Sequence, residues 1–269
     1  MKKILLASLF LVSFTTAMAE ATENGLLARA IAGTHRSEQH KFRDQYRHPL
    51  QTLRFFEVDA DMTVVEIWPG GKGWYTEILA PYLKPQGVLY AAHFSANSGI
   101  AYFTKSLAQF KEKMSAQPER YGNVILTQLH APDALAIAPV GSADRVLTFR
   151  NVHNWMKKAQ ADAVFTAMYQ ALKPGGILGV VEHRAPANSH PDTHALSGYV
   201  TEAYVIALAE KAGFRFLASS AINANPKDSA KHPKGVWTLP PTLKLKEQDK
   251  EKYLAIGESD RMTLKFIKP

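Results

Sequence analysis

The segment covering residues 64–76 constrains the fold of this chain more than any other part of the sequence. Residues 64–67 read Val-Val-Glu-Ile, the pattern of a buried β-strand that ends beside an acidic side chain. Glycines follow at positions 70, 71 and 73, and a helix is expected from Tyr75 to Leu83. Glycine allows backbone conformations that other residues avoid and lets a ligand come close to the main chain. A strand, a glycine turn and a helix start in this order predict a cradle for a nucleotide-like ligand.

Strands and helices alternate along the chain from residue 62 onwards. Strands are predicted at residues 63–67, 87–93, 123–128, 143–149, 177–182, 214–219 and 262–267. Further helices are predicted at residues 102–114, 159–172 and 201–212. Strands separated by helical segments indicate an α/β fold, with a parallel sheet covered by helices on both faces.

The first 19 residues are typical of a bacterial secretory signal peptide. A short basic region at residues 1–3 precedes an apolar run at residues 4–14, and a small-x-small pattern ends at Ala19. We therefore expect cleavage before Glu20 and a periplasmic or secreted protein. No later segment is apolar for long enough to be transmembrane. The mature chain is expected to have an N-terminal helical extension at residues 20–57 and one domain at residues 58–269.

Composition excludes several kinds of chemistry. The chain has no cysteine, so a disulfide framework, a thiol nucleophile and a zinc–thiolate site are impossible. Lys and Arg total 32 against 24 Asp and Glu, and the net charge of +8 favours anionic ligands. Because the basic residues are scattered, they predict a solvated surface and no nucleic-acid partner.

Polar and aromatic side chains follow most of the predicted strands. In a sheet of this type, ligands bind at the carboxyl ends of the strands. These ends carry residues 66–75, 93–94, 130–133, 150–155 and 182–184. Their convergence predicts one ligand-binding site at this edge of the sheet.

Several segments resemble class I S-adenosylmethionine-dependent methyltransferases. The matching segments are residues 66–83, 146–155, 172–184, 213–214 and 257–262. More narrowly, the chain resembles a group of predicted exported bacterial methyltransferases whose loop reads E-I-W-P-G-G-G-W-Y-T. This resemblance covers about residues 35–269. It implies a Rossmann-like methyltransferase fold with a mostly parallel seven-stranded sheet, and S-adenosylmethionine as the cofactor.

The resemblance also implies which residues hold the cofactor. The glycine loop would hold its methionine end, the end of the second strand its ribose, and residues 133–134 its adenine. The expected cofactor-binding residues are Glu66, Pro69, Gly70, Gly71, Gly73, Tyr75, His93, Asp133, Ala134 and Arg150. Three positions depart from the family pattern: Trp68 replaces the first loop glycine, Lys72 is an extra residue, and His93 stands where an acid is usual.

Methyl transfer needs an aligned acceptor and, where the acceptor carries a proton, a base. His153 follows the fourth strand, where the methyl group would point, and it is the candidate base. Asn151 and Glu182 complete the expected catalytic set. The alternative is that His153 only caps or orients the following helix.

Other charged segments allow both a functional and a structural interpretation. Arg184 could hold an anionic substrate, or it could pair with Glu182 inside the protein. The segment containing Arg43 and Arg47 suits either a lid or, more readily, a solvated helix face. The pattern His190-x-Asp192-x-His194 has ligand-like spacing, but no third ligand is apparent, so no metal is predicted.

Two functions compete at this point. The first is a methyltransferase acting on a small molecule, with an anionic substrate as one expectation. The second is an exported ligand-binding protein that has this fold without methyl-transfer activity. Export and the altered cofactor positions support the second, because S-adenosylmethionine is made in the cytosol. A nicotinamide-dependent oxidoreductase is disfavoured, because the loop lacks the Gly-x-Gly-x-x-Gly pattern.

Overall fold

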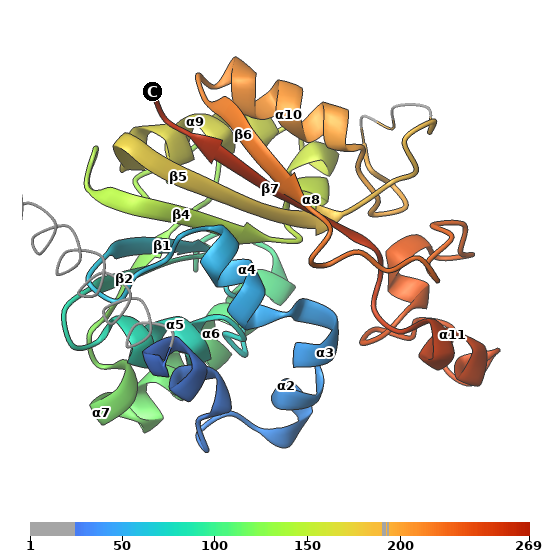
Figure 1. Ribbon diagram of the computed structural model, residues 1–269, viewed down its shortest axis with the longest axis horizontal. Coiled ribbons are helices and arrows are strands. Elements are labelled where there is room, and N and C mark those ends of the chain that lie inside the picture. The colour runs from blue at the N-terminus through green and yellow to red at the C-terminus, as the bar shows by residue number, and fades with distance from the viewer. Residues whose placement is uncertain (1–24, 190–191, 193) are drawn as a thin grey trace, which may run out of the picture.

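The computed structural model describes residues 25–189, 192 and 194–269. A seven-stranded sheet forms its centre (Figure 1). The strands are β1 (Thr63–Ile67), β2 (Val88–His93), β3 (Val124–Gln128), β4 (Ala143–Phe149), β5 (Leu172–His183), β6 (Arg215–Ser220) and β7 (Arg261–Ile267). Their order is β3-β2-β1-β4-β5-β7-β6, and β7 runs antiparallel to both of its neighbours. The expected mostly parallel seven-stranded sheet is confirmed. The predicted signal peptide lies outside the described residues.

Successive side chains of the central strands pack on opposite faces of the sheet, as the pleat requires. Val65 and Val146 belong to the hydrophobic cluster on one face, whereas Val64 and Leu147 belong to the cluster on the other. The first face is covered by α8 (Val152–Lys157), α9 (Ala161–Ala171) and α10 (Glu202–Lys211). The second is covered by the N-terminal helices, α5 (Thr76–Leu83) and α7 (Pro118–Tyr121). Central strands that are buried on both faces explain the nearly continuous apolar runs in the sequence.

Several short elements were not predicted from the sequence. They include α7, α8, the 3-10 helix η1 (Gly235–Thr238) and α11 (Lys250–Ile256). Helices of one or two turns are too short to display a 3.6-residue period. The longer α6 (Ala101–Ala116) agrees with the predicted helix at residues 102–114. Among the described residues, no helix is long and apolar enough to cross a membrane.

Residues 25–32 are helical, and they are followed by α2 (Glu38–Phe42), α3 (Asp44–Arg47) and α4 (Pro49–Phe55). His48 has a left-handed backbone conformation, with φ of 39°, which separates α3 from α4. Phe56 is fully buried and packs in the same cluster as Val64 and Leu79. The extension is therefore part of the same hydrophobic core as the sheet.

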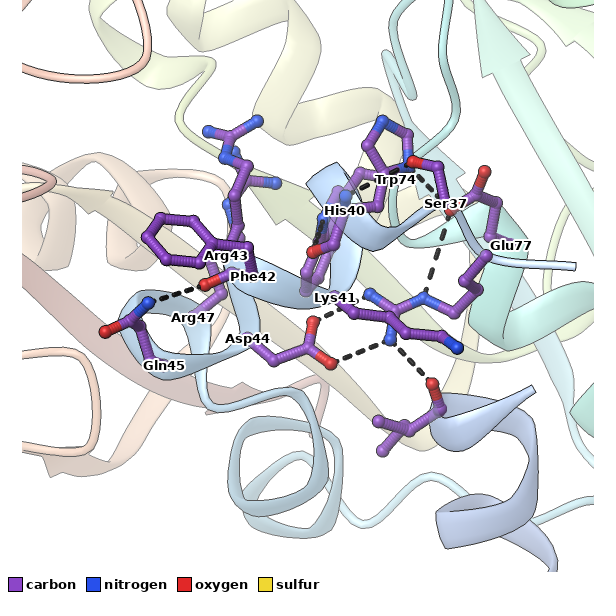
Figure 2. Close-up of polar contacts among 12 residues, drawn as sticks. Ser37, His40, Lys41, Phe42, Arg43, Asp44, Gln45, Arg47, Trp74 and Glu77 are labelled. Carbon is purple, nitrogen blue, oxygen red and sulfur yellow. Dashed lines mark hydrogen bonds and ion pairs between the residues drawn. The ribbon is translucent and has the colours of Figure 1, made fainter. Parts of the chain in front are cut away.

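A buried carboxylate on α5 fixes the extension (Figure 2). Glu77 lies 2.6 Å from Nδ1 of His40. It also accepts a hydrogen bond from Lys113. Arg36 lies 3.9 Å from the same carboxylate, and Nε1 of Trp74 donates to the His40 carbonyl at 3.1 Å. Burial alone would raise the pKa of Glu77, but the bonds from His40 and Lys113 hold that pKa below its usual value. The charged segment is thus docked, and a solvated helix face is the wrong description of it.

Replacing this carboxylate should loosen the extension. We expect Glu77→Ala to lower the free energy of unfolding by about 3 kcal/mol, because it removes the counter-charge of Lys113 and the hydrogen-bond partner of the buried His40 ring. Urea unfolding followed by circular dichroism measures this change. The matched control is Glu38→Ala, because the exposed Glu38–Lys41 pair should contribute less than about 1 kcal/mol. Equal effects of the two substitutions would contradict the proposed anchor.

Candidate functional site

A cavity of about 940 Å³ opens at the carboxyl ends of the parallel strands. Loops after β1, β2, β3 and β4 contribute to its wall, as do the end of β5, the α2–α3 segment and the connection between β6 and β7. The predicted site residues that line it are Pro69, Gly70, Arg150, Asn151 and His153. The site therefore lies at the predicted edge of the sheet.

Glycine is required at the three loop positions for different structural reasons. A Cβ atom added at Gly70 would meet no atom within 4 Å, and its φ of 72° also favours glycine. At Gly71 a Cβ would lie 2.5 Å from Oε1 of Gln109, and at Gly73 it would lie 2.9 Å from Oγ1 of Thr76. Gly70 thus presents bare backbone to the cavity, whereas the other two glycines accommodate neighbouring protein groups.

Glu66 and Tyr75 lie beneath the loop and do not line the cavity. Glu66 is only 2% exposed, and its carboxyl group accepts a 2.6 Å hydrogen bond from Oγ1 of Thr76. Burial raises the pKa of Glu66 to about 7. The Tyr75 ring stacks on Phe149, and this pair supports the base of the cavity.

Trp68 fills the space above the ends of β2 and β3. Its backbone has φ of 47°, a conformation that usually requires glycine, which is the residue expected at this position. The indole packs against Phe94 and Trp155, and Nε1 donates a 3.0 Å hydrogen bond to the Leu129 carbonyl. Trp68 therefore gives this end of the cavity an aromatic wall.

The residues predicted to hold the ribose and adenine do not line the cavity. His93 is fully buried, and its Nδ1 accepts the backbone N–H of Phe94 at 2.8 Å. Burial lowers the pKa of His93 to about 4, so the ring is neutral near pH 7. Asp133 is exposed on a turn closed by backbone hydrogen bonds between His130 and Ala134. Of the residues in this turn, His130 is the one that lines the cavity.

His153 and Glu182 form a buried pair beside the cavity. Oε1 of Glu182 lies 3.0 Å from Nδ1 of His153, and Oε2 accepts the backbone N–H of His153 at 3.2 Å. The same carboxylate accepts the backbone N–H of His183 at 2.8 Å. Because Nδ1 is engaged, Nε2 is the His153 nitrogen left for another partner. Glu182 does not line the cavity and acts from behind the ring.

Asn151 holds the loop that carries His153. Its Nδ2 donates to the Ile67 carbonyl at 3.0 Å and to Oγ1 of Thr148 at 3.3 Å. These bonds tie the start of α8 to the ends of β1 and β4. Asn151 therefore positions this loop, although it also lines the cavity.

His183 brings a third potential ligand atom beside His153 and Glu182, and it was not among the candidate ligands predicted from the sequence. Ligand atoms of His153, Glu182 and His183 all lie within 4.8 Å of one another. Burial, His153 and Arg261 hold the pKa of His183 well below its usual value. The positive charges of the neighbouring arginines disfavour a bound cation here. In the His190-x-Asp192-x-His194 pattern, from which no metal was predicted, Asp192 accepts hydrogen bonds from backbone N–H groups of its own exposed loop, and His190 lies outside the described residues.

Arg184 forms an internal ion pair. Its guanidinium binds both oxygens of Asp260, at 2.8 and 2.9 Å, and Oε1 of Glu202 at 3.1 Å. Its partners are thus acidic residues other than the expected Glu182. Because the fork is filled, Arg184 is not available to an anionic substrate.

Four other arginines surround one buried carboxylate, that of Glu258, and all five residues line the cavity. We call the four the arginine cluster, and its members are Arg43, Arg47, Arg150 and Arg261. Glu258 is only 2% exposed. Burial opposes its ionisation, but the charges of Arg261, Arg47 and Arg43 together hold its pKa well below its usual value. In the sequence, Glu258 and Arg261 belong to the segment at residues 257–262, which carried the family resemblance but no predicted role.

Comparison with known proteins defines the fold. No protein family model and no curated protein matches this chain. A SAM-dependent methyltransferase from Aquifex aeolicus is 14% identical, with a TM-score of 0.55 over 84% of this chain and 93% of that one. The [4+2]-cyclase SpnF is also 14% identical, with a TM-score of 0.57 over 83% and 81%.

A third solved structure carries ligands. Haemonchus contortus phospholethanolamine N-methyltransferase 2, in complex with phosphomonomethylethanolamine and S-adenosylhomocysteine, is 18% identical. Its TM-score is 0.51 over 83% of this chain and 53% of that one. The expected Rossmann-like methyltransferase fold is confirmed by these likenesses.

The buried acid at the end of β1 should make stability depend on pH. Because the folded pKa of Glu66 is about 7 and its usual value is 4.5, the folded state retains a proton that the unfolded state releases. The contribution of Glu66 to stability is therefore greatest below pH 4.5 and falls as the pH rises towards 7. Between pH 5 and pH 7, the free energy of unfolding of the wild type should fall by about 2 kcal/mol more than that of Glu66→Gln. Urea unfolding at the two pH values measures this, and parallel curves would contradict it.

Proposed function

We propose that this protein is a S-adenosylmethionine-dependent methyltransferase acting on a small molecule. The observation that carries this proposal is a single cavity, at the carboxyl ends of the strands, that reaches from Gly70 to His153. The fold is shared with a SAM-dependent methyltransferase, and ligands of such sheets bind at this edge. A cavity of about 940 Å³ is large enough for a cofactor and a small acceptor together.

The residues at one end of the cavity fit the cofactor. Gly70 offers exposed backbone to the methionine end of the cofactor. Phe94 and Phe103 stack with ring centroids 4.0 Å apart, and the neighbouring Tyr102 is 67% exposed. These rings offer apolar surface for an adenine.

The ribose end fits less well. Among the described residues that line the cavity, Glu258 is the one carboxylate, and it is already paired with arginines. His93 is fully buried and neutral, so it supplies no charged acceptor to ribose hydroxyls. Ribose binding would rely on His130 and on backbone groups instead.

The chain's own residues would provide alignment and proton removal. Bound S-adenosylmethionine supplies a methyl group already activated by its sulfonium. Nε2 of His153 would accept the proton of the acceptor group, while Glu182 holds the opposite nitrogen and stabilises the charged ring. Asn151 would fix the loop that sets the distance between His153 and the acceptor.

The second candidate is a ligand-binding protein without methyl transfer. It is favoured by the lack of a cavity-lining carboxylate at the end of β2. The same fold is found in a [4+2]-cyclase, so the fold alone does not require methyl transfer.

Calorimetric titration of the mature protein tests the proposal. We expect S-adenosylmethionine and S-adenosylhomocysteine to bind with dissociation constants below about 1 mM, because one cavity offers groups for both ends of the ligand. The lack of binding to both at millimolar concentration would exclude methyl transfer and leave the second candidate.

Substitution at the proposed base separates binding from turnover. His153→Ala should bind S-adenosylhomocysteine as tightly as the wild type, while turnover of a methyl acceptor falls by about 10²–10⁴-fold. Glu182→Gln, which keeps the shape of the side chain, should show a smaller fall. Unchanged turnover in His153→Ala would remove His153 from the mechanism.

We propose that the chain is exported and processed before Glu20. The basic and apolar segments of residues 1–19 support this proposal. Expression with a C-terminal tag, followed by cell fractionation and N-terminal sequencing, should give a periplasmic or secreted protein that begins at Glu20. Retention of Met1 on a cytosolic protein would contradict it.

A further inference from the structure

We propose that the substrate of this site carries a dianionic oxyanion group of the phosphate-monoester type, and that the arginine cluster binds it. This inference rests on the proposed function for the identity of the ligand as a substrate. The binding of the oxyanion itself depends only on charges and hydrogen-bond donors of the cavity wall.

The charges in this part of the cavity are unbalanced. Four guanidinium groups face one ionised carboxylate, which leaves an excess of three positive charges. The neighbouring Tyr75 does not compensate, because burial raises its pKa to about 12 and keeps its phenol neutral. Arg47 and Arg261 are 3% and 2% exposed, so bulk water screens their charges poorly. Buried cations in excess of their counter-ions are stabilised by an anion.

Among the described residues, most hydrogen-bond donors of the cluster have no protein partner. Arg43 donates from Nε to Glu258 at 2.5 Å, and Arg47 donates from Nε to Glu258 at 3.4 Å. Arg261 donates from its two terminal nitrogens, to the Tyr46 carbonyl and to Glu258. Its Nε is buried and has no hydrogen-bond partner within the described part of the chain. Buried donors of this kind are unusual unless a ligand or water satisfies them.

Arg150 is the most available member of the cluster. Among the described residues its guanidinium makes no hydrogen bond, and its nearest ionic contact is Glu258 at 3.9 Å. Its side chain is 25% exposed, and its backbone has φ of 63°, which is uncommon for an arginine. Burial and the charge of Arg261 lower the pKa of Arg150 to about 10. A bound anion would relieve this repulsion.

Rigid elements hold the cluster in place. Arg43 and Arg47 come from the docked extension, where Arg47 lies over the Trp74 ring at 4.6 Å from its centroid, and Figure 2 labels these side chains. Arg150 follows β4, and Arg261 begins β7. Because the wall is preformed, little conformational entropy would be lost when the anion binds.

The positive charge of the cofactor indicates that the anion bound by the arginine cluster belongs to the substrate. S-adenosylmethionine carries a sulfonium, an ammonium and one carboxylate, so its net charge is +1. Even if Arg150 holds that carboxylate, binding of the cofactor increases the positive charge of the cavity. A dianionic acceptor substrate would offset the excess, whereas a neutral or cationic acceptor would not. Guanidinium forks also match phosphate oxygens in a bidentate manner.

Titration with inorganic phosphate at constant ionic strength, without cofactor, tests the proposal. We expect phosphate to bind the mature protein by calorimetry and to raise its melting temperature above that in sodium chloride of equal ionic strength. Arg150→Asn should weaken phosphate binding by at least tenfold, because Asn tolerates the left-handed backbone and removes the charge. Arg43→Gln should also weaken phosphate binding by at least tenfold. Arg43→Lys should have an intermediate affinity for phosphate, because it keeps the charge but loses the bidentate guanidinium.

The matched control is Arg54→Gln, which removes one positive charge from an exposed position on α4. It should bind phosphate as the wild type does. Circular dichroism without phosphate verifies that each variant is folded. Equal weakening by Arg54→Gln, no phosphate effect beyond that of chloride, or tighter binding of succinate than of phosphate would each overturn the proposal.

The outcome is separable from that of the proposed function. Binding of phosphate without any binding of S-adenosylhomocysteine would retain the oxyanion site and reject methyl transfer. If both bind, S-adenosylmethionine should bind at least as tightly in saturating phosphate as without it. Displacement of phosphate by the cofactor would assign the cluster to the methionine carboxylate and overturn a substrate site.

Discussion

The ionised carboxylate of Glu258 joins parts of the chain that are far apart in sequence. It pairs with Arg43 and Arg47, which precede it by 215 and 211 residues, and with Arg261, which is three residues away. The extension, the end of β4 and the start of β7 thus meet at one buried negative charge. The shape of the cavity depends on this contact, because each of these elements supplies part of its wall.

The cavity has two chemically different ends. Aromatic side chains around Trp68 and Phe94 line one end, and guanidinium groups line the other. His153 also lies on the wall and is oriented by Glu182 from behind. An adenosyl group suits the aromatic end and an oxyanion suits the other. Trp68 is central to this division, since its indole occupies space that a glycine would leave open.

Much of the fold could be predicted from the sequence because it depends on local patterns. The apolar runs of β1 and β4 and the helix at 101–116 were found within a residue or two. The end of α9 was less accurate. The predicted helix at residues 159–172 ends at Ala171, and the strand predicted at residues 177–182 already begins at Leu172, because Leu172 pairs with Ala143 across the sheet. Such a pairing lies between strands and has no local signal.

The site was predicted only in part. Pro69, Gly70, Arg150, Asn151 and His153 line the cavity as expected, whereas His93, Asp133 and Glu182 do not. The rule that strand ends carry ligands selects the edge of the sheet, but it does not tell which side chains are covered by others. His93, for example, is fully buried beside Phe94. Arg47 illustrates the opposite error: a charged helix predicts exposure, yet its guanidinium is buried by long-range contacts.

The sequence by itself determined the α/β architecture, the position of the glycine loop and the edge of the sheet where a ligand would bind. These features follow from hydrophobic periodicity and from the backbone freedom of glycine, which act over a few residues. Only the tertiary structure decided that four arginines share one glutamate, that Arg184 is internally paired, and that Glu182 supports His153. Each of these contacts joins side chains whose electrostatic partners are chosen by packing, because burial strengthens charge interactions that no spacing along the chain encodes.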